Sequence, residues 1–123
     1  MTKQILVVDD DDGVREIIQM SLEAAAGWTV WTAPSGKEGI KLAEEKQPDL
    51  ILLDVMMPEE DGVVTYQKLQ SNDKTNAIPT IMLTAKAQVS ERQTLMEIGI
   101  NGIITKPFKV RALVQQITEM MAW

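Results

Sequence analysis

The sequence predicts an α/β domain in which a doubly wound sheet of five parallel strands carries helices on both faces. Two observations indicate this fold class. Short apolar runs alternate with longer stretches whose apolar residues recur at helical spacing, which is typical of strand–helix–strand units. Several of the apolar runs are almost continuous, as expected for strands covered by helices on both sides. The chain has 123 residues, enough for one hydrophobic core but not for two, so we expect a single domain over residues 1–123.

Five short runs rich in β-branched residues or leucine are the predicted strands. In chain order they are QILVV (4–8), TVWT (29–32), DLILL (49–53), PTIML (79–83) and GIIT (102–105). The first, third and fourth runs are nearly continuous in apolar residues, so we expect both of their faces to be covered.

Helices are predicted between these strands and after the last one. The first and last helices have clear apolar stripes at i, i+3, i+4 spacing, formed by Val14, Ile17, Ile18, Leu22 and Ala25, and by Val110, Leu113, Val114, Ile117 and Met121. The segments near 36–46, 62–71 and 88–98 have weaker stripes. Gly27 and Gly99 lie where C-terminal helix caps are expected.

The composition excludes several classes of function. A net charge of −6 argues against direct nucleic-acid binding, which needs a basic face. The sequence has neither an apolar run as long as a membrane span nor a secretory leader. It contains no cysteine and no histidine, which excludes disulfides, thiolate chemistry, histidine metal sites and the Ser-His-Asp triad. We therefore expect a cytoplasmic protein whose chemistry uses carboxylates, lysines, hydroxyls or a hard metal ion.

Polar residues follow four of the five predicted strands. The first strand is followed by Asp9 and Asp10, the third by Asp54, the fourth by Thr84 and the fifth by Lys106. In open parallel sheets, ligands bind outside the carboxyl ends of the strands, where the strand order reverses. We therefore expect these five side chains to converge at one edge of the sheet.

The residue types at this edge indicate phosphoryl chemistry with a metal ion. Clustered carboxylates without histidine or cysteine suit a hard divalent cation, and Mg²⁺ is the predicted cofactor. Asp54 could then attack phosphorus, since carboxylates are known to form covalent intermediates. Lys106 supplies a compact positive charge for the added oxygens, and Thr84 can donate a hydrogen bond to one of them.

Four sequence motifs, in this order and at this spacing, resemble the receiver domain of two-component response regulators. The motifs are ILVVDDDDGVR, DLILLDVMMPEEDG, PTIMLTA and GIITKPF, and the resemblance covers essentially the whole chain. It implies a flavodoxin-like sheet with strand order 2-1-3-4-5 and five helices. It also implies that Asp54 is the phosphoacceptor, that Thr84 is a switch hydroxyl and that Lys106 neutralises the phosphoryl group. The implied Mg²⁺ ligands are Asp9, Asp10, Asp54 and the backbone carbonyl of Met56.

The same resemblance implies partners. The phosphoryl group would come from a histidine of a sensor histidine kinase or a phosphotransfer protein, because this chain has no histidine of its own. The chain would catalyse its own phosphorylation and a slow dephosphorylation, but would otherwise be a switch and not an enzyme. A downstream effector protein would act in trans, by binding the face formed by the helix near 88–98, the strand 102–105 and the last helix. We expect no direct nucleic-acid or membrane partner, and a monomer or a phosphorylation-dependent dimer.

Three positions call for specific expectations within this resemblance. Ile103 stands where the family usually has Tyr or Phe, so we expect a static or partly exposed residue and no aromatic switch. Met56 and Lys86 are at positions that tune phosphoryl lifetime, and Met56 cannot orient a water by hydrogen bonding, so we expect slow self-hydrolysis. The bond between Lys106 and Pro107 is typically cis in the family.

Two other interpretations start from the same residues. Asp10-x-Asp12-Gly-Val resembles the signature of haloacid-dehalogenase-type phosphohydrolases, with Asp10 as nucleophile and Asp12 as acid/base. Such enzymes need an acidic motif downstream of the lysine, where this chain has Glu119 alone. A pseudo-receiver that binds partners without phosphorylation would keep the fold, but that usually goes with the loss of an acidic or lysine position. Asp11 and Asp12 are better explained as residues that start a helix than as metal ligands.

Overall fold

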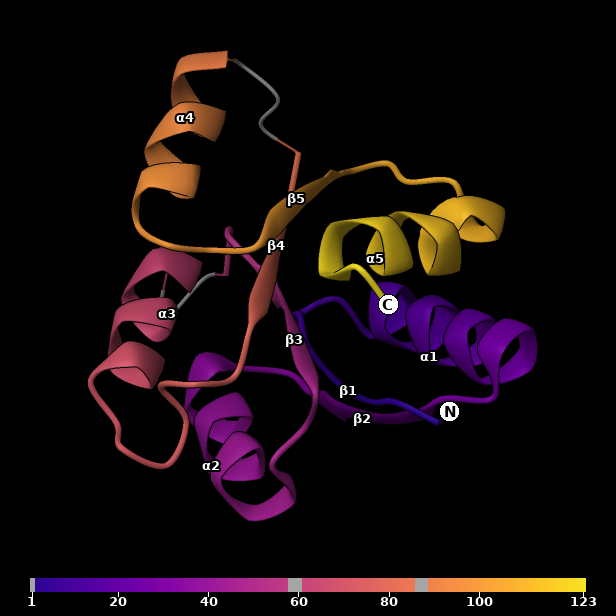
Figure 1. Cartoon of the computed structure of the whole chain (residues 1–123), viewed down its shortest axis with the longest axis horizontal. Helices are drawn as coiled ribbons and strands as arrows, with labels where there is room; N and C mark the ends of the chain where they lie inside the picture. Colours follow the sequence, from indigo (N-terminus) through magenta and orange to yellow (C-terminus); the bar gives the residue numbers. More distant parts are fainter. Residues whose placement is uncertain (1, 58–60, 86–88) are drawn as a thin grey trace.

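The predicted doubly wound fold is confirmed by a computed structural model, which describes residues 2–57, 61–85 and 89–123 (Figure 1). Within these residues the strands are β1 (Gln4–Val8), β2 (Thr29–Ala33), β3 (Leu50–Asp54), β4 (Thr80–Thr84) and β5 (Gly102–Thr105). All neighbouring strands are parallel, in the order β2-β1-β3-β4-β5 that the resemblance implied. The third and fourth strands lie one residue further along the chain than predicted, because the parallel ladder extends through Asp54 and Thr84.

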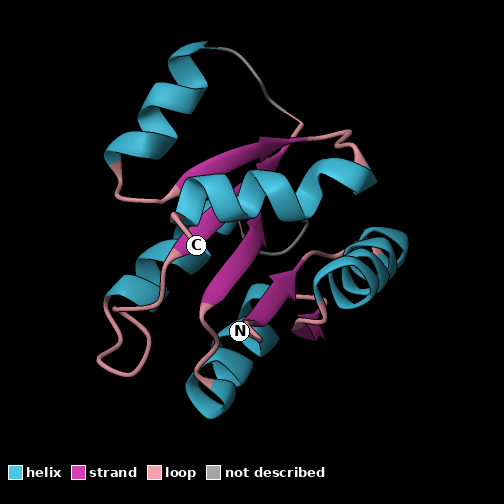
Figure 2. Cartoon of the chain, turned by 45° about the vertical axis from the view of Figure 1, so that its right-hand side comes forward, coloured by secondary structure: helices cyan, strands magenta, loops and turns pink. Residues whose placement is uncertain are grey.

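Helices cover both faces of the sheet (Figure 2). In the described residues they are α1 (Asp12–Ala26), α2 (Gly36–Lys46), α3 (Gly62–Gln70), α4 (Val89–Glu97) and α5 (Leu113–Met121), with a short 3₁₀ turn, η1 (Val110–Ala112), before α5. Helices α1 and α5 lie on one face, and α2 and α3 on the other (Figure 1). None of the described helices is long and apolar enough to span a membrane.

The start of α1 confirms the expected role of the second pair of aspartates. Asp11 is the N-cap, and its Oδ1 accepts hydrogen bonds from the backbone N–H groups of Gly13 and Val14 at 2.8 and 3.1 Å. Asp12 lies in the first turn, where it is exposed and forms an ion pair with Arg15. The Asp11 carboxylate gives partners to N–H groups that have none within the helix. The negative charge of Asp12 is favourable at the N-terminus of the helix.

The side chains of the sheet alternate between two apolar cores. One core packs against α1 and α5, and the other packs against α2, α3 and α4. The alternation is clear in β1, where Ile5 and Val7 belong to the first core and Leu6 and Val8 to the second. Because both faces are covered, the central strands are almost wholly buried, which explains their nearly continuous apolar sequence.

The environment of Ile103 corrects one expectation. Its side chain is 6% exposed and belongs to the second core, together with Met82 of β4 and Leu95 of α4. The alternative that Ile103 is partly exposed is therefore wrong: an aliphatic side chain on β5 is stabilised by burial in the core. That Ile103 is static stays a prediction. Lys86, the other residue linked to phosphoryl lifetime, lies outside the described residues.

Candidate functional site

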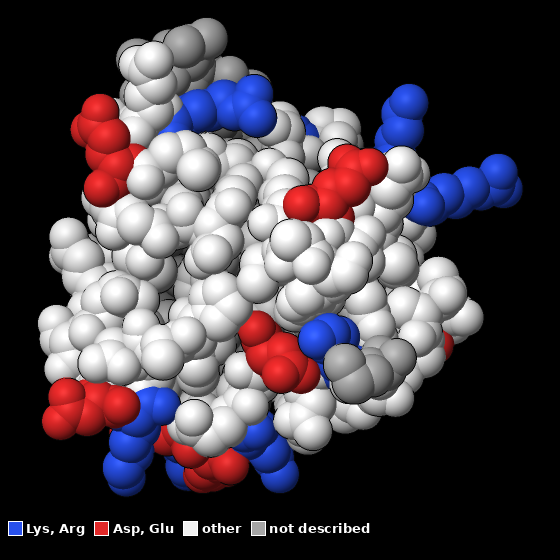
Figure 3. All heavy atoms as spheres, in the orientation of Figure 1, with Lys and Arg blue, Asp and Glu red and all other residues white. Residues whose placement is uncertain are grey.

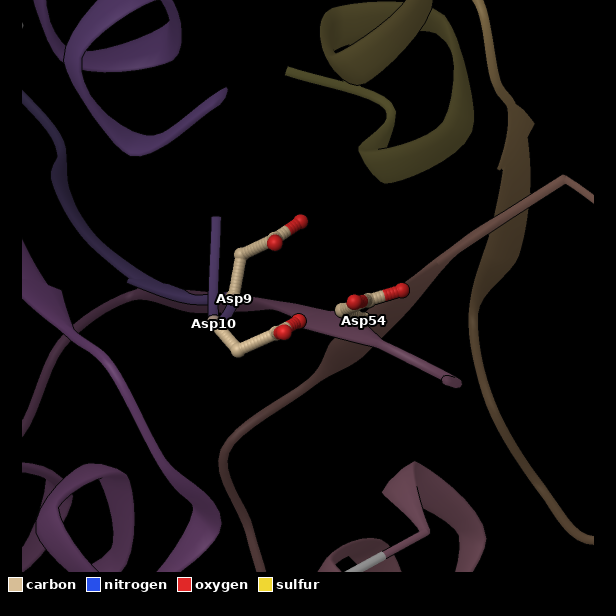
Figure 4. Close-up of side chains that lie close together, drawn as sticks. All are labelled: Asp9, Asp10 and Asp54. Carbon is tan, nitrogen blue, oxygen red and sulfur yellow. The ribbon is translucent and has the colours of Figure 1, made fainter. Parts of the chain in front are cut away.

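Three carboxylates meet where β1 and β3 end side by side. Asp9 and Asp10 follow β1, and Asp54 is the last residue of β3. Figure 4 shows the three side chains next to one another at this edge of the sheet. Each offers a carboxylate oxygen, and these oxygens all lie within 4.8 Å of one another. The structure therefore brings together the three aspartates that the sequence predicted to converge.

Hydrogen bonds fix Asp9 on several sides. It is fully buried, and its Oδ1 accepts a hydrogen bond from the backbone N–H of Asp11 at 2.9 Å. Its Oδ2 accepts a hydrogen bond from the Lys106 ammonium at 2.7 Å. The Arg15 guanidinium donates to the backbone carbonyl of Asp9 at 2.7 Å. Asp10, by contrast, is exposed, so this carboxylate is open to solvent while its neighbour is held by the protein.

Lys106 follows β5, and its side chain contacts residues at the ends of β1 and β3. Its Nζ lies 2.7 Å from Asp9 Oδ2 and 3.4 Å from Asp54 Oδ1. Its backbone N–H donates to the carbonyl of Thr84 at 2.8 Å, which holds the buried Thr84 at the same edge. The peptide bond between Lys106 and Pro107 is cis, as the resemblance implied. All five predicted side chains thus come from strand ends at one edge of the sheet.

The environment of Asp54 raises the pKa of its carboxyl group above the ordinary value. Burial raises the pKa of Asp54 to about 6, and the negative charge of Asp9 adds to this effect. Lys106 and a hydrogen bond of 3.2 Å from the backbone N–H of Met56 act in the opposite direction. Burial by itself lowers the pKa of Lys106, but its hydrogen bond to Asp9 and the charges of both aspartates outweigh this, so the pKa is raised. Lys106 therefore stays cationic at neutral pH.

A glycine allows α3 to approach the backbone of the site. A Cβ atom on Gly62 would lie 2.2 Å from the carbonyl oxygen of Asp54 and 2.8 Å from the Cα of Val55. The Gly62 N–H also donates to the carbonyl of Val55 at 2.8 Å. Because these neighbours are backbone atoms, they cannot move aside as a flexible side chain could. Gly62 therefore lets the helix start pack directly against the strand end that carries Asp54.

Two residues, Arg15 and Gly62, make contacts at this site that their sequence motifs did not predict. Arg15 is part of the motif ILVVDDDDGVR, and its position one turn into the predicted helix was the available signal. Gly62 is part of DLILLDVMMPEEDG, where a glycine after acidic residues suggests an ordinary turn. The sequence could not show that Gly62 touches Asp54, because that contact depends on how closely α3 approaches β3.

The donor set limits the chemistry of the site. Three oxygen ligands from carboxylates fit a hard divalent cation, which would offset the repulsion between them. The charge of Lys106 suits added anionic oxygens close to Asp54. Asp12 is turned to solvent and paired with Arg15, so the structure does not join it to Asp10 as a nucleophile and acid/base pair. This arrangement does not favour the phosphohydrolase interpretation.

The strand order, the acidic cluster at its reversal point and the adjacent lysine define a doubly wound α/β domain with a candidate ligand site at the switch point of its sheet. Over residues 5–118 the chain matches the family described as response regulator receiver domain. The chain therefore belongs to this family, and it is a signalling domain of phosphorelay systems.

Characterised relatives are regulators of transcription. The chain is 36% identical over 118 residues to the DNA-binding dual master transcriptional regulator RpaA of Synechocystis sp.. It is 40% identical over 111 residues to the alkaline phosphatase synthesis transcriptional regulatory protein PhoP of Bacillus subtilis. These matches cover 96% and 90% of this chain, but 48% and 45% of the relatives. The chain thus spans about half the length of the curated relatives that it matches.

Solved structures agree with the fold. The chemotaxis protein CheY4 of Vibrio cholerae superposes with a TM-score of 0.89 at 27% identity, covering 98% of this chain and 99% of that one. The receiver domain of the sensor histidine kinase PA1611 from Pseudomonas aeruginosa superposes with a TM-score of 0.85 at 26% identity over all of both chains. That second structure has a magnesium ion coordinated in its active-site cleft.

Proposed function

We propose that this chain is a phosphorylation switch in which Asp54 accepts a phosphoryl group. The observation that carries the proposal is the cluster of Asp9, Asp10 and Asp54 with Lys106 beside it, in a chain of the receiver-domain family. An Asp54 oxygen would attack the phosphorus of a phosphohistidine on a sensor histidine kinase or a phosphotransfer protein. The P–N bond would break as the new P–O bond forms. Since Asp54 has a pKa of about 6, it is mostly an ionised nucleophile at neutral pH.

A magnesium ion would be held by Asp9, Asp10, Asp54 and the backbone carbonyl of Met56. When bound, Mg²⁺ supplies positive charge for the phosphoryl oxygens and offsets the repulsion between the aspartates. The hydrogen bond of Lys106 to Asp9 keeps a second positive charge at the same place. Thr84, buried at the end of β4, would donate its hydroxyl hydrogen to a phosphoryl oxygen. Each of these residue roles is part of the proposal.

The phosphorylated chain would signal through a protein partner. We assign the effector surface to α4, β5 and α5, and we place the protein in the cytoplasm as a monomer or a phosphorylation-dependent dimer. On the face that Figure 3 shows, acidic and basic side chains are interspersed, and the net charge of the chain is −6. Both features support a protein partner over direct contact with nucleic acid.

The proposal is tested by phosphorylation with a small donor. Wild type and Asp54→Asn are incubated with acetyl phosphate, with and without Mg²⁺, and the intact mass is measured. We expect the mass of one phosphoryl group on wild type, dependent on Mg²⁺, and no gain on Asp54→Asn. Because asparagine keeps the size of the side chain, we expect the variant to fold. Circular dichroism checks this as the control. An unchanged mass gain in Asp54→Asn would move the acceptor elsewhere, with Asp10 the first residue to test.

A further inference from the structure

Three methionines among the described residues are exposed to solvent. The exposed fractions are 62% for Met20, 56% for Met56 and 47% for Met96, whereas Met82 is fully buried. The sequence contains no cysteine, so methionine is the residue that offers sulfur to an oxidant. Methionine sulfur is oxidised readily to the sulfoxide where it is accessible. These three side chains are therefore the most accessible sulfur targets for a peroxide in the described part of the chain.

Met56 differs from the other two in its position. Its backbone N–H donates a hydrogen bond to Asp54 Oδ1 at 3.2 Å, so its exposed side chain starts next to the acidic cluster. Met20 lies on α1 and Met96 on α4, away from the strand ends that form the site. Met57, the next residue, is half-buried and packs against the second core. Met56 thus combines an exposed side chain with a backbone N–H that donates directly to the carboxylate of Asp54.

We propose that Met56 is a modification site at which hydrogen peroxide forms methionine sulfoxide, and that this change shortens the lifetime of a phosphoryl group on Asp54. The second part rests on the proposed function. In the reaction, the sulfur lone pair attacks one peroxide oxygen and forms the S–O bond as the O–O bond breaks. The sulfur loses two electrons, and the peroxide is reduced to one molecule of water after proton transfer. The modification is reversible, because methionine sulfoxide reductases restore the thioether.

The expected effect follows from the change in hydrogen bonding. A thioether sulfur is a weak acceptor, so unmodified Met56 does not hold a water firmly. A sulfoxide oxygen is polar and accepts hydrogen bonds, and at this position it could hold a water near the phosphoryl group of Asp54. A water oriented in this way attacks phosphorus more often, so the aspartyl phosphate is hydrolysed faster. Oxidation of Met20 or Met96 creates no acceptor beside Asp54 and should leave the lifetime unchanged.

The experiment compares methionine variants before and after peroxide. Wild type, Met56→Leu, Met20→Leu and Met96→Leu are treated with hydrogen peroxide, desalted and phosphorylated with acetyl phosphate and Mg²⁺. Peptide mass spectrometry measures the sulfoxide at each methionine, and intact mass follows the decay of the phosphoryl group after the donor is removed. Each sample is compared with its own untreated protein, because the backbone carbonyl of Met56 belongs to the proposed metal site. Buried Met82 is the internal control for unfolding, since it should stay reduced.

We expect peroxide to convert Met56 and to accelerate decay several-fold in wild type, Met20→Leu and Met96→Leu. The decay in Met56→Leu should not change with peroxide, and treatment of oxidised wild type with methionine sulfoxide reductases should restore the original lifetime. Equal acceleration in Met56→Leu, or a Met56 that stays reduced while Met20 is oxidised, would overturn the inference. Phosphorylation with an unchanged lifetime despite sulfoxide at Met56 would overturn it as well. A lack of any mass gain in untreated wild type would instead refute the proposed function, and this inference with it.

Discussion

The two ends of the sheet differ in the contacts that their side chains make: charged groups cluster at one end and aromatic rings pack at the other. At the carboxyl end, the carboxylates of Asp9 and Asp54 are buried together and share one ammonium group. At the amino end, the ring of Trp123 meets that of Trp28 edge to face, with the ring centroids 5.5 Å apart and the planes at 88°. The ammonium of Lys3 lies 4.6 Å from the centroid of the Trp123 ring. The amino end thus uses contacts that stabilise the fold, while the carboxyl end concentrates charges that repel one another.

This difference places contacts that stabilise the fold and charged residues of the candidate site at opposite ends of the sheet. Burial of the Asp54 carboxylate, and after it the negative charge of Asp9, disfavours the ionised form in the folded state, and the raised pKa of Asp54 reflects this cost in stability. Aromatic contacts at the opposite end are attractive in any state of the site. Substitutions at the amino end should therefore change stability without changing phosphorylation, whereas those at the carboxyl end should change both.

The largest expected effect comes from a methyl group at the carboxyl end. In Gly62→Ala the added Cβ would lie 2.2 Å from the Asp54 carbonyl oxygen, so the strand end or the start of α3 must shift. We expect a loss of roughly 3 kcal/mol in the free energy of unfolding, at the upper end of typical overpacking costs. Phosphorylation by acetyl phosphate should also slow markedly. Urea unfolding and intact mass measure the two effects.

Gly27→Ala is the matched control at the amino end. Gly27 has a φ of 67° and nothing within 4 Å of an added Cβ, so the cost is conformational, about 1 kcal/mol. Phosphorylation of this variant should match wild type. If Gly62→Ala were as stable and as active as Gly27→Ala, the close approach of α3 to Asp54 would have no part in the site.

Residues whose location in the fold follows from their position along the chain could be predicted from the sequence. Asp9, Asp10, Asp54, Thr84 and Lys106 all follow predicted strands, and parallel strands bring such positions to one edge. The cap at Asp11 follows from local chemistry in the same way. In these cases the periodicity of the strands and helices was enough.

Contacts that depend on packing distance could not be predicted in this way. The approach of α3 to Asp54 at Gly62 and the bond from Arg15 to the Asp9 carbonyl both depend on how helices sit on the sheet. Ile103 shows the same limit, because its burial depends on how the side chains of α4 and of the strands pack into one core. The sequence identified the residue as aliphatic, but its depth is a property of the assembled core.

The second largest effect concerns the pH dependence of stability. The pKa of Asp54 is about 6 in the folded state against its ordinary value of 3.8, so between these pH values the folded chain binds more protons than the unfolded chain. The free energy of unfolding contributed by this group therefore falls as the pH rises through that window. Asp54→Asn removes the titration, so the variant should be more stable than wild type by about 1–3 kcal/mol above pH 7. The difference should shrink as the pH is lowered toward 5.

Urea unfolding of wild type and Asp54→Asn from pH 5 to pH 8 measures this difference. Under the proposed function, added Mg²⁺ should reduce it at pH 8, because an ion bound by the folded wild-type site would stabilise the folded state. Asp61→Asn, a substitution at the exposed N-cap of α3 outside the cluster, is the control variant measured over the same pH range. A difference between wild type and Asp54→Asn that is constant with pH would show that burial of the charge at Asp54 does not destabilise the fold.

The smallest effect tests the amino end directly. Trp123→Ala removes the edge-to-face contact with Trp28 and the position of the Lys3 ammonium over the ring. Because Trp123 is partly exposed, we expect a loss of about 1 kcal/mol, within the range of one aromatic pair. Trp123→Phe should recover part of this loss, since an aromatic ring remains to meet Trp28. The rate of phosphorylation by acetyl phosphate should be the same in all three proteins. A slower rate in Trp123→Ala, at a temperature where the variant is fully folded, would show that the two ends of the sheet are coupled and that folding and signalling are not separated in this chain.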